Sequence, residues 1–545
     1  MRARLRDPFT WIVLAFALFC AVGAAWNIPC TDAWSNDEVS PRASMLGAVF
    51  ETWVPGHFFR YPPLHVLSLT VLQSPLILVG VLRAGLDQAA IERELIQPSY
   101  MTPAAIVGRL VAFAMALTFV WNQKRLWERL GSRRVGLAAA ALTACNPIFV
   151  YFAHTASVDV PYLFWTSFAL VEIDRVAQGE SRERHLALFA TAALLTKDQS
   201  AFLLLGPLLL VFGIGRLLAA EPGKKLLALW QPRLLRAGAL GIGVFLVVSG
   251  IVTNPSGFRK KLEFMSWGNR EWVVYERSWH GLGEQLADIA RSIPLYGAWI
   301  VAAAALAGLV VAARSPERQR RLMPAVAALS YFALFVVPSR WTMERHLMPL
   351  SLFLFPYAGF LLERIRDARL AVATAVAFLL PQLRDVASVD GTLVADSRPE
   401  ATRFLEGLPA GTKVEIYGGN QYLPLLPPQL DVTRVGLEDF AARSALPHVV
   451  EKKEPFGQIA ARDPEYLVLS ESTAGFHAPP PGTRLSGQGR LEAADPDGQA
   501  FFRELEAGTG PYVRVLRAQC TLPWPLECRR IHLSTGVETW IYRRR

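Results

Sequence analysis

Long apolar stretches alternate with short clusters of Arg and Lys along the first 383 residues of this chain. The first stretch, residues 9–28 (FTWIVLAFALFCAVGAAWNI), is uncharged and long enough to cross a bilayer core of about 30 Å as a helix. Similar stretches follow, roughly at residues 64–82, 104–121, 135–153, 158–171, 186–196, 199–219, 237–253, 293–313, 323–338, 347–362 and 370–383. This pattern predicts a polytopic α-helical membrane protein.

The basic clusters predict which stretches cross the membrane, because short loops rich in Lys and Arg stay in the cytoplasm. If residues 64–82 crossed, the cluster at 124–134 and those after it would lie outside; if they do not cross, all lie inside. We therefore expect residues 64–82 to lie along the outer face, with the helix interrupted at Gln73-Ser74-Pro75. The result is about eleven transmembrane helices, with the N-terminus in the cytoplasm.

The chain changes character near residue 384, where Pro, Gly and charged residues become frequent. Strand-like runs occur at 413–417 (KVEIY) and 466–470 (YLVLS), and a helix-like stretch at 399–408 precedes the first. We expect two domains. Residues 1–383 form a transmembrane domain with a long outer loop, 29–103, and residues 384–545 form a small extracytoplasmic α/β domain of ordinary size.

Composition agrees with a multi-pass protein of the inner (plasma) membrane. The mean hydropathy is +0.27 and 19% of residues are charged, against about 25% in soluble proteins. Cytoplasmic loops account for the net charge of +10, and no DNA- or RNA-binding motif accompanies it, so nucleic acid is not an expected partner.

The five cysteines suggest a disulfide and no metal centre. The spacing of Cys520 and Cys528 in the tail permits a disulfide if the tail is extracytoplasmic. CxxC and HExxH spacings are absent, so no cofactor is assigned, and a divalent metal ion stays open.

Asp37 and Glu38 directly follow the first apolar stretch, where a substrate at the outer surface would meet them. An acidic pair in a loop can also be solvated or cap a helix, and both interpretations stay open. The same loop contains Arg60-Tyr61-Pro62-Pro63, and the two prolines fix an extended entry into the next apolar segment.

A second acidic centre is Asp159, in a short outer hairpin (AHTASVDVP, 153–161) that also carries His154. Asp159 either caps the next helix or binds at the reaction site, and the two roles are compatible. Three cations lie at outer positions: Arg109 just inside a crossing, Lys197 between two apolar runs, and Arg345 beside His346. Their alternatives are snorkelling for Arg109, a simple Lys–Asp pair for Lys197 and interfacial anchoring for Arg345.

These motifs, in this order and on this side of the membrane, resemble the membrane-embedded GT-C glycosyltransferases, in the branch of protein O-mannosyltransferases and the lipid A aminoarabinose transferase. The matching pieces, which span about residues 1–360, are Asp37-Glu38, Tyr61-Pro62-Pro63-Leu64, Gly108-Arg109-Leu110, Asn146-Pro147 with His154 and Asp159, Thr196-Lys197 and Arg345-His346-Leu347-Met348-Pro349-Leu350.

The resemblance implies an inverting transfer of a sugar from a polyprenyl-phosphate carrier to an extracytoplasmic acceptor, which is a lipid, a glycan or a protein hydroxyl. It implies Asp37 as general base, with Glu38 and Asp159 as further catalytic candidates. It assigns the donor phosphate to Arg109, Lys197, Arg345 and Arg60, and substrate binding to Tyr61, His154 and His346.

Two departures from the family pattern bear on the sugar. The family often has Arg-Tyr where this chain has Arg345-His346, and the aminoarabinose branch has Lys where this chain has Tyr61. A neutral hexose or pentose is therefore the expected donor sugar. The alternatives are a polyprenyl-lipid transporter or flippase, which would want charges at the bilayer midplane, and a catalytically inactive membrane scaffold.

Overall fold

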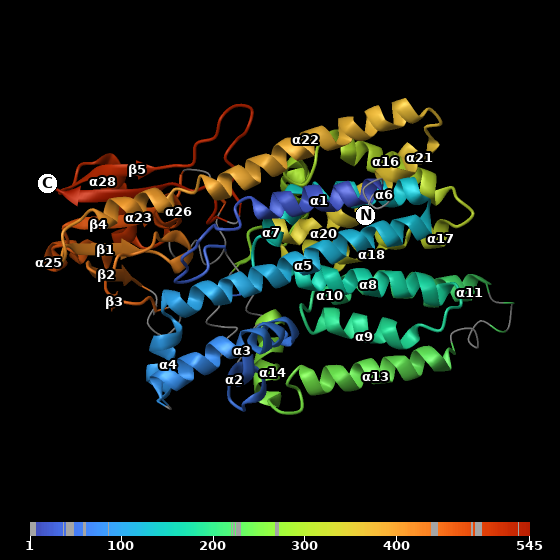
Figure 1. Cartoon of the computed structure of the whole chain (residues 1–545), viewed down its shortest axis with the longest axis horizontal. Helices are drawn as coiled ribbons and strands as arrows, with labels where there is room; N and C mark the ends of the chain where they lie inside the picture. The colour runs from blue at the N-terminus through green and yellow to red at the C-terminus, as the bar shows by residue number, and fades with distance from the viewer. Residues whose placement is uncertain are drawn as a thin grey trace.

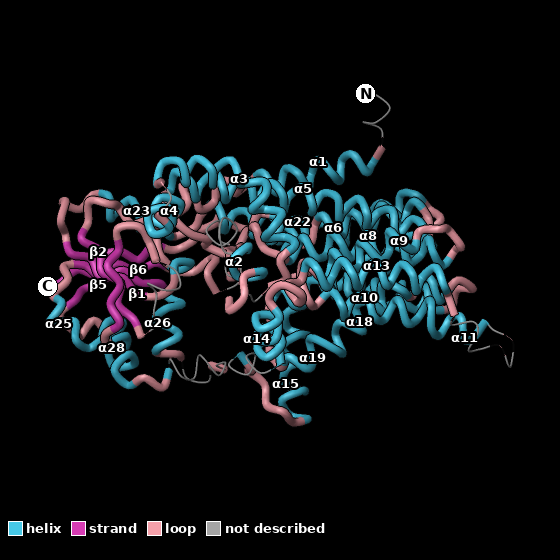
Figure 2. Tube along the Cα trace, turned by 90° about the horizontal axis from the view of Figure 1, so that it is seen from below, coloured by secondary structure: helices cyan, strands magenta, loops and turns pink. Residues whose placement is uncertain are grey.

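The computed structural model describes residues 7–35, 38–39, 48–57, 61–85, 87–219, 221, 224, 230–266, 272–437, 445–480, 483–484, 493–531 and 533–545. Helices make up most of the molecule, and a β-sheet lies at one end of its long axis (Figure 1). Figure 2 shows the same division from another side, with the strands gathered beyond one end of the helical body. The predicted class, a helical body with a C-terminal sheet domain, is confirmed at this level.

The helices before the sheet domain follow the predicted apolar stretches closely. They are α1 (Pro8–Ala21), α2 (Ala48–Trp53), α3 (Leu64–Ala84), α4 (Gln88–Leu95), α5 (Pro98–Leu130), α6 (Arg133–Ala144), α7 (Pro147–Ala153), α8 (Asp159–Ala177), α9 (Glu183–Leu194), α10 (Ser200–Leu208), α11 (Gly215–Ala219), α13 (Pro232–Val248), α14 (Pro255–Ser266), α15 (Trp279–Ser292), α16 (Trp299–Ala313), α17 (Arg318–Arg321), α18 (Met323–Tyr331), α19 (Val337–Ser339), α20 (Glu344–Leu354), α21 (Ala358–Arg364) and α22 (Ala368–Val394).

Polar caps set the start of several of these helices. Asp7 accepts the backbone N–H of Phe9 at the start of α1, and Asn146 accepts that of Phe149 at the start of α7, where Pro147 takes the first position. A proline at this position loses nothing, because its missing N–H would have had no partner within the helix. The cap at Asn146 also produces the 65° bend between α6 and α7 that brings the following hairpin to the site.

By length and composition, five helices in the described part of the chain can cross a membrane, or seven if each bent pair is one span. The five are Leu64–Ala84, Pro98–Leu130, Ser200–Leu218, Glu344–Arg364 and Ala368–Glu406. Shorter apolar helices, among them α1, pack against them. The chain is therefore a multi-pass membrane protein, and the number of about eleven crossings stays a prediction.

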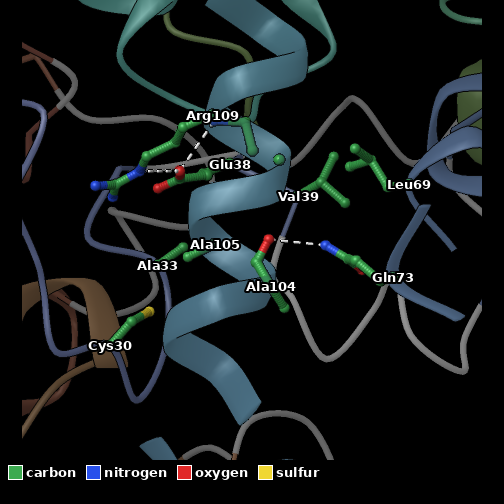
Figure 3. Close-up of a pocket in the computed structure, with 11 residues that line it drawn as sticks. Cys30, Ala33, Glu38, Val39, Leu69, Gln73, Ala104, Ala105 and Arg109 are labelled. Atoms are coloured by element: carbon green, nitrogen blue, oxygen red, sulfur yellow. Dashed lines mark hydrogen bonds and ion pairs between the residues drawn. The ribbon is translucent and has the colours of Figure 1, made fainter. Parts of the chain in front are cut away.

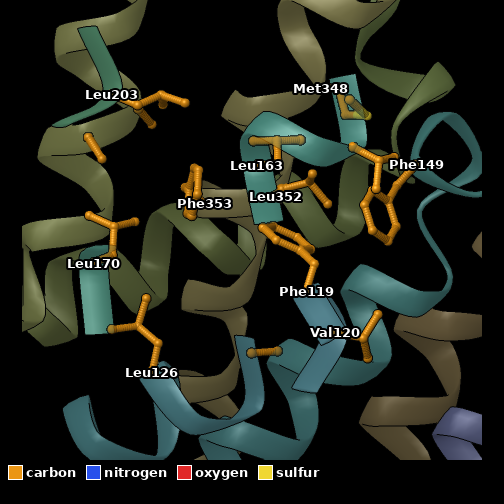
Figure 4. Packing of buried hydrophobic residues seen from close by; sticks show 14 of the residues in the cluster. Phe119, Val120, Leu126, Phe149, Leu163, Leu170, Leu203, Met348, Leu352 and Phe353 are labelled. Carbon is orange, nitrogen blue, oxygen red and sulfur yellow. The ribbon is translucent and has the colours of Figure 1, made fainter. Parts of the chain in front are cut away.

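A continuous apolar core joins the central helices (Figure 4). Phe119 on α5 packs between Phe149 of α7, at a ring distance of 5.2 Å, and Phe353 of α20, at 6.3 Å. Segments more than 200 residues apart in the sequence thus share one core around α5. This packing fixes the helix ends from which the polar residues of the site project.

The predicted interruption at Gln73-Ser74-Pro75 is wrong, because α3 continues unbroken through Pro75. Pro75 has no N–H to offer the carbonyl of Val71, one helical turn earlier. The hydroxyl of Ser74 donates to that carbonyl at 2.8 Å and satisfies it. Gln73 turns inward and donates to the carbonyl of Ala104 on α5, so α3 lies against the N-terminal part of α5. Whether α3 crosses the membrane stays a prediction.

The C-terminal domain has a six-stranded sheet of order β3-β2-β1-β4-β6-β5. Its elements are α23 (Arg398–Glu406), β1 (Lys413–Tyr417), β2 (Asp431–Gly436), β3 (Val449–Lys453), α25 (Ile459–Arg462), β4 (Tyr466–Ser470), α26 (Glu471–His477), α28 (Pro496–Ala507), β5 (Tyr512–Ala518) and β6 (Thr539–Arg544). The four strands β3, β2, β1 and β4 run parallel, and β6 pairs antiparallel with β4 and β5.

The sequence-predicted strands at 413–417 and 466–470 coincide with β1 and β4, which are neighbours in the sheet. Position 384, where we expected the tail domain to begin, lies inside α22, which runs on to Val394. The helix therefore carries the chain directly from the helical body to the sheet. Cys520 and Cys528 are joined by a disulfide, with their Cα atoms 6.1 Å apart.

Candidate functional site

Glu38 lies in a buried pocket between the segment after α1, the N-terminal half of α5 and the hairpin before α8 (Figure 3). Its Oε1 accepts the backbone N–H of Ala156 at 3.0 Å and lies 3.4 Å from Nε of Arg109. An isolated β-bridge pairs Glu38 with Ser157, and the N–H of Val39 donates to the carbonyl of Ala156. The acidic segment is thus paired, strand to strand, with the hairpin that carries Asp159.

Ser35 fixes the other side of the same segment. The hydroxyl of Tyr151 on α7 donates to Oγ of Ser35 at 2.9 Å, and the N–H of Glu38 donates to the carbonyl of Ser35. Both Ser35 and Glu38 are therefore held against the α7–α8 hairpin. Asp37 and Arg60 lie outside the described residues, and Tyr61 is half-buried just before α3.

Arg109 is buried on α5 and faces Glu38 (Figure 3). Its Nη1 donates to the carbonyl of Trp26, and its guanidinium lies over the indole of Trp26 with Cζ 5.7 Å from the ring centroid. An arginine within an apolar helix is costly unless it has a partner, and Glu38 and Trp26 supply two. Snorkelling therefore does not describe Arg109, whose side chain is 9% exposed.

Two atoms of this pair retain unused bonding capacity. Within the described residues, Glu38 Oε2 and Arg109 Nη2 are buried and have no hydrogen-bond partner. Buried polar atoms without partners are costly, so they usually mark a place where another group binds. The pocket around them is lined by Cys30, Ala33, Glu38, Val39, Leu69, Gln73, Ala104, Ala105, Gly108, Arg109 and Ala156. Burial raises the pKa of the Cys30 thiol to about 12, so Cys30 is a neutral lining residue at pH 7.

Asp159 and Lys197 form the second charged pair of the site. Lys197 Nζ donates to Asp159 Oδ1 at 2.6 Å, and their side chains are 5% and 1% exposed. Asp159 is the first residue of α8, but its side chain makes no capping hydrogen bond and turns to Lys197 instead. The ammonium also lies 5.2 Å from the ring centroid of Tyr162. Asp198, next to Lys197, pairs with Lys261 of α14 at 3.0 Å.

Arg345 and His346 lie in the first turn of α20 and are buried. Cζ of Arg345 lies 5.9 Å from the ring centroid of Trp341, and the imidazole of His346 packs edge-on against Trp341 and Phe335. The position of Arg345 beside the Asp159–Lys197 pair stays a prediction.

His154 is not among the residues that line the pocket, and its contacts join three helices. Its Nδ1 lies 2.8 Å from the carbonyl of Val150, and its Nε2 lies 2.6 Å from that of Val22 at the end of α1. The nearest carboxylate is that of Asp390 on α22, at 3.8 Å from Nε2. These contacts are with protein groups that hold α1, α7 and α22 together, so substrate binding by His154 stays a prediction.

The site therefore consists of two buried ion pairs joined by a short segment. Glu38–Arg109 and Asp159–Lys197 are connected through residues 156–159, where the N–H of Asp159 also donates to Oγ of Ser157. Among the described residues, no group of three or more His, Cys, Asp or Glu side chains is placed to hold a metal ion. The sequence analysis missed Trp26 and Asp390, which show no motif and acquire contacts only through folding.

No protein-family model and no curated protein matches the chain. Among solved structures it is similar to ArnT from Cupriavidus metallidurans in the apo state, with 17% identity, a TM-score of 0.45, and 86% of this chain and 95% of that one covered. For ArnT bound to undecaprenyl phosphate the identity is 16%, the TM-score is 0.47 and the coverage of both chains is the same. For the Archaeoglobus fulgidus oligosaccharyltransferase tethered with an acceptor peptide, the identity is 10% and the TM-score is 0.47. The match covers 91% of this chain and 72% of that one.

Each of these likenesses has an identity below 25% and a TM-score below 0.5, so the resemblance to the GT-C glycosyltransferases rests on the motifs of this chain and stays a prediction. At these identities and TM-scores the likeness does not extend to the reaction. What the chain does must follow from its own residues.

Proposed function

We propose that this protein is a membrane glycosyltransferase that moves a sugar from a polyprenyl-phosphate carrier to an extracytoplasmic acceptor, with inversion at the anomeric carbon. The observation that carries the proposal is the buried pair of Glu38 and Arg109, in which each partner has one buried atom with no hydrogen-bond partner among the described residues. The free guanidinium nitrogen suits an anion such as a phosphate, and the free carboxylate oxygen suits an acceptor hydroxyl, which Glu38 would orient beside the neighbouring Asp37.

In the proposed reaction, the acceptor hydroxyl attacks the anomeric carbon while the bond from that carbon to the phosphate oxygen breaks. Asp37, joined directly to Glu38 along the chain, takes the hydroxyl proton. The polyprenyl phosphate leaves as an anion, and Arg109, Lys197 and Arg345 stabilise its charge, with Arg60 as a further cation.

The ion pairs have a second role in this proposal, because several buried cations cannot lie near each other without compensation. Glu38 and Asp159 hold Arg109 and Lys197 in place when no donor phosphate is bound. Arg109 then needs no new orientation to meet the phosphate, since Nη2 is still available while Nε faces Glu38. This arrangement lowers the cost of ordering the site on binding.

A transporter or flippase is less well supported by these residues. Most of the buried charges of the site lie at helix ends and hairpins, since Asp159 begins α8 and Lys197 lies between α9 and α10, while Arg109 lies in the N-terminal half of α5. A path for a charged headgroup would need such residues along the middle of the helices. We propose a neutral hexose or pentose as the donor sugar. The acceptor is proposed as a class, a lipid, a glycan or a protein hydroxyl.

The test is mass spectrometry of envelope lipids and glycans from a deletion strain, with and without the wild-type gene. We expect the deletion to lose one glycan substituent and to accumulate its polyprenyl-phosphate-linked sugar. Complementation with Asp431→Asn, a substitution at an exposed residue of β2, should restore the substituent, whereas Asp37→Asn should not. An unchanged glycan and lipid profile in the deletion strain would contradict the proposed function.

A further inference from the structure

The indole of Trp26 lies between two buried guanidinium groups from distant parts of the fold. Arg109, on α5, has Cζ 5.7 Å from the ring centroid of Trp26, and Arg398, at the start of α23, has Cζ 5.6 Å from it. Trp26 is 5% exposed and Arg398 is fully buried. One aromatic ring thus contacts a cation of the candidate active site and a cation of the C-terminal domain.

Hydrogen bonds fix Trp26 from both sides. Its carbonyl accepts from Nη1 of Arg109, and its Nε1–H donates to Oδ2 of Asp396 at 3.0 Å. Asp396 in turn accepts from Nε of Arg398 at 2.8 Å and from the backbone N–H of Arg398 at 2.9 Å. Arg398, Asp396, Trp26 and Arg109 therefore form one continuous chain of contacts that ends at Glu38.

In the C-terminal domain, Arg398 makes further contacts that fix its side chain. Nη1 of Arg398 donates to the carbonyl of Gln421, after β1, and its guanidinium lies 4.1 Å from the ring centroid of Trp34. Nearby, Nδ2 of Asn420 donates to Oδ2 of Asp32 at 2.5 Å. Trp34 and Asp32 belong to the same segment as Glu38, so the sheet domain contacts the segment that carries the acidic pair.

We propose that Asp396 and Arg398 are positioning residues for the reaction. They hold Trp26, and Trp26 orients Arg109 through its carbonyl and its ring, so that Arg109 faces Glu38. This inference rests on the proposed function only in assigning Arg109 and Glu38 to the active site. Small displacements of such groups cost up to about 100-fold in rate, so an anchor in a separate domain affects catalysis without touching substrate.

The test compares two substitutions in this chain of contacts with one matched control. Trp26→Phe keeps a ring between the cations but removes the hydrogen bond to Asp396, and Arg398→Lys keeps the charge but removes the bidentate contact. Arg462→Lys is the control, because Arg462 also forms a buried two-bond pair, with Glu415, but has no described contact with Trp26. All three change a buried contact without removing a charge.

We expect Trp26→Phe and Arg398→Lys to lower kcat roughly 10-fold with little change in the donor KM, while Arg462→Lys keeps wild-type kcat. Hydrogen exchange gives a readout that does not need transfer activity. Amides in residues 33–35 and 105–112 should exchange faster in the first two variants and as in the wild type in the control.

If all three variants alter exchange and kcat alike, Asp396 and Arg398 serve only general stability and the inference is wrong. Unchanged exchange at 105–112 in Trp26→Phe overturns it as well. A wild-type protein that transfers no sugar would contradict the proposed function alone, because the exchange result would still decide whether the C-terminal domain orders Arg109.

A second inference concerns the loop closed by the disulfide of Cys520 and Cys528. Its sequence, TLPWPLE between the two cysteines, places Trp524 at the tip, where 93% of the side chain is exposed. In Figure 1 this part of the chain, in red between β5 and β6, extends over α22. Pro523 and Pro525 on either side of Trp524 are exposed as well, so the loop has an apolar tip.

Hydrogen bonds hold the loop against the C-terminal half of α22. The backbone N–H groups of Glu527 and Arg529 donate to the hydroxyls of Ser388 and Thr392, and Arg529 Nη2 donates to Asp385. Below these residues α22 exposes an apolar face, with Leu380 64% and Val376 53% exposed. Leu380 and Ser388 are separated by about 12 Å along the helix, so the loop lies just beyond the end of the apolar face.

We infer that this loop inserts Trp524 into the headgroup region of the bilayer beside α22. Tryptophan is enriched at that depth, where its ring meets acyl chains and its N–H meets water. Arg384, on α22 between the apolar face and the loop, pairs with Asp385 at 2.9 Å, and its side chain is 46% exposed, so it can also contact a lipid phosphate. The loop would fix the C-terminal domain relative to the membrane surface, independently of the reaction proposed above.

The test is an environment-sensitive NBD label at position 524 in phosphatidylcholine proteoliposomes, in a protein that carries Trp524→Cys and keeps the disulfide. Doxyl groups near the lipid headgroups should quench this label at least twofold more than one at Val513→Cys, on an exposed position of β5. Equal quenching at both positions, or quenching of neither, would overturn the inference. Shielding that depends on protein concentration instead of lipid would assign the loop to a second copy of the chain.

Discussion

The carboxylate of Glu38 accepts the backbone N–H of Ala156 at 3.0 Å, so the acidic segment after α1 is fastened to the hairpin that leads into α8. The same carboxylate faces Arg109 at 3.4 Å. Glu38 therefore has a defined structural partner on each side, which makes it the organising residue of the site. Asp37, its neighbour in sequence, is left as the candidate for proton transfer.

Replacing Asp37 by Asn should lower turnover by roughly 10²–10⁴-fold, since the amide keeps the shape of the side chain but cannot accept a proton. The measurement is the release of polyprenyl phosphate by purified protein in detergent. Asp431→Asn, at an exposed position of β2, serves as the control and should keep the wild-type rate. A normal rate in Asp37→Asn, with normal expression, would show that Asp37 is structural.

Glu38→Gln should destabilise the fold, because it leaves the guanidinium of Arg109 buried without its carboxylate. Breaking a buried ion pair costs about 3–5 kcal/mol, while removing both charges costs less. We expect Glu38→Gln and Arg109→Gln each to lower Tm, and the double variant to lower it by less than the sum. A thermal shift assay of the four proteins measures this coupling. Additive shifts would mean that the two side chains do not interact in solution.

Lys197 requires a similar design, since its removal leaves Asp159 buried and unpaired. Lys197→Met alone should therefore lose stability, and Lys197→Met with Asp159→Asn should recover most of it. If Lys197 also binds the donor phosphate, the stable double variant should still show a donor KM raised about 10-fold, because one charge-assisted contact is worth about 1.5 kcal/mol. An unchanged KM in the double variant would restrict Lys197 to pairing with Asp159.

The sequence predicted the helices and strands well, because their length and composition carry most of the signal. KVEIY and YLVLS became β1 and β4, and each long apolar run became a helix. The continuity of α3 through Pro75 was not foreseeable from the proline alone, since one hydroxyl, that of Ser74, satisfies the carbonyl that Pro75 leaves without a partner. Helix breaking by proline depends on such local partners.

The site was only partly predictable, because pairing depends on the fold and not on spacing. Asp198 is adjacent to Lys197 in the sequence, yet Lys197 pairs with Asp159, and Asp198 pairs with Lys261. Trp26 was part of an apolar run and carried no motif. Its contacts with Arg109 and Asp396 link segments 83 and 370 residues away, which no local pattern encodes.

The C-terminal domain should be extracytoplasmic, because the basic clusters then all face the cytoplasm. A fusion of alkaline phosphatase after Arg545 should be active, since this enzyme folds only where disulfides form. The disulfide of Cys520 and Cys528 fits such a compartment. A C-terminal GFP fusion is the complementary measurement, and bright fluorescence there would place the domain in the cytoplasm and contradict an odd number of crossings.

The last prediction is that α3 does not cross the membrane, although its length and composition would allow it. If α3 stays on one side, Glu51 in α2 and Glu92 in α4 must lie on the same side, because α3 is the helix between them. Both positions are exposed, so single cysteines there should react with an impermeant maleimide added to intact cells.

In this labelling experiment, Cys20, Cys30 and Cys145 are replaced by Ala, and the disulfide stays oxidised. Arg318→Cys on α17 is the matched control and should react only after the membrane is permeabilised, since it belongs to a basic cluster that we predict to be cytoplasmic. If Glu51→Cys and Glu92→Cys react from opposite sides, α3 is a crossing. The basic cluster at residues 124–134, at the C-terminal end of α5, would then face outward, because one further crossing inverts everything that follows.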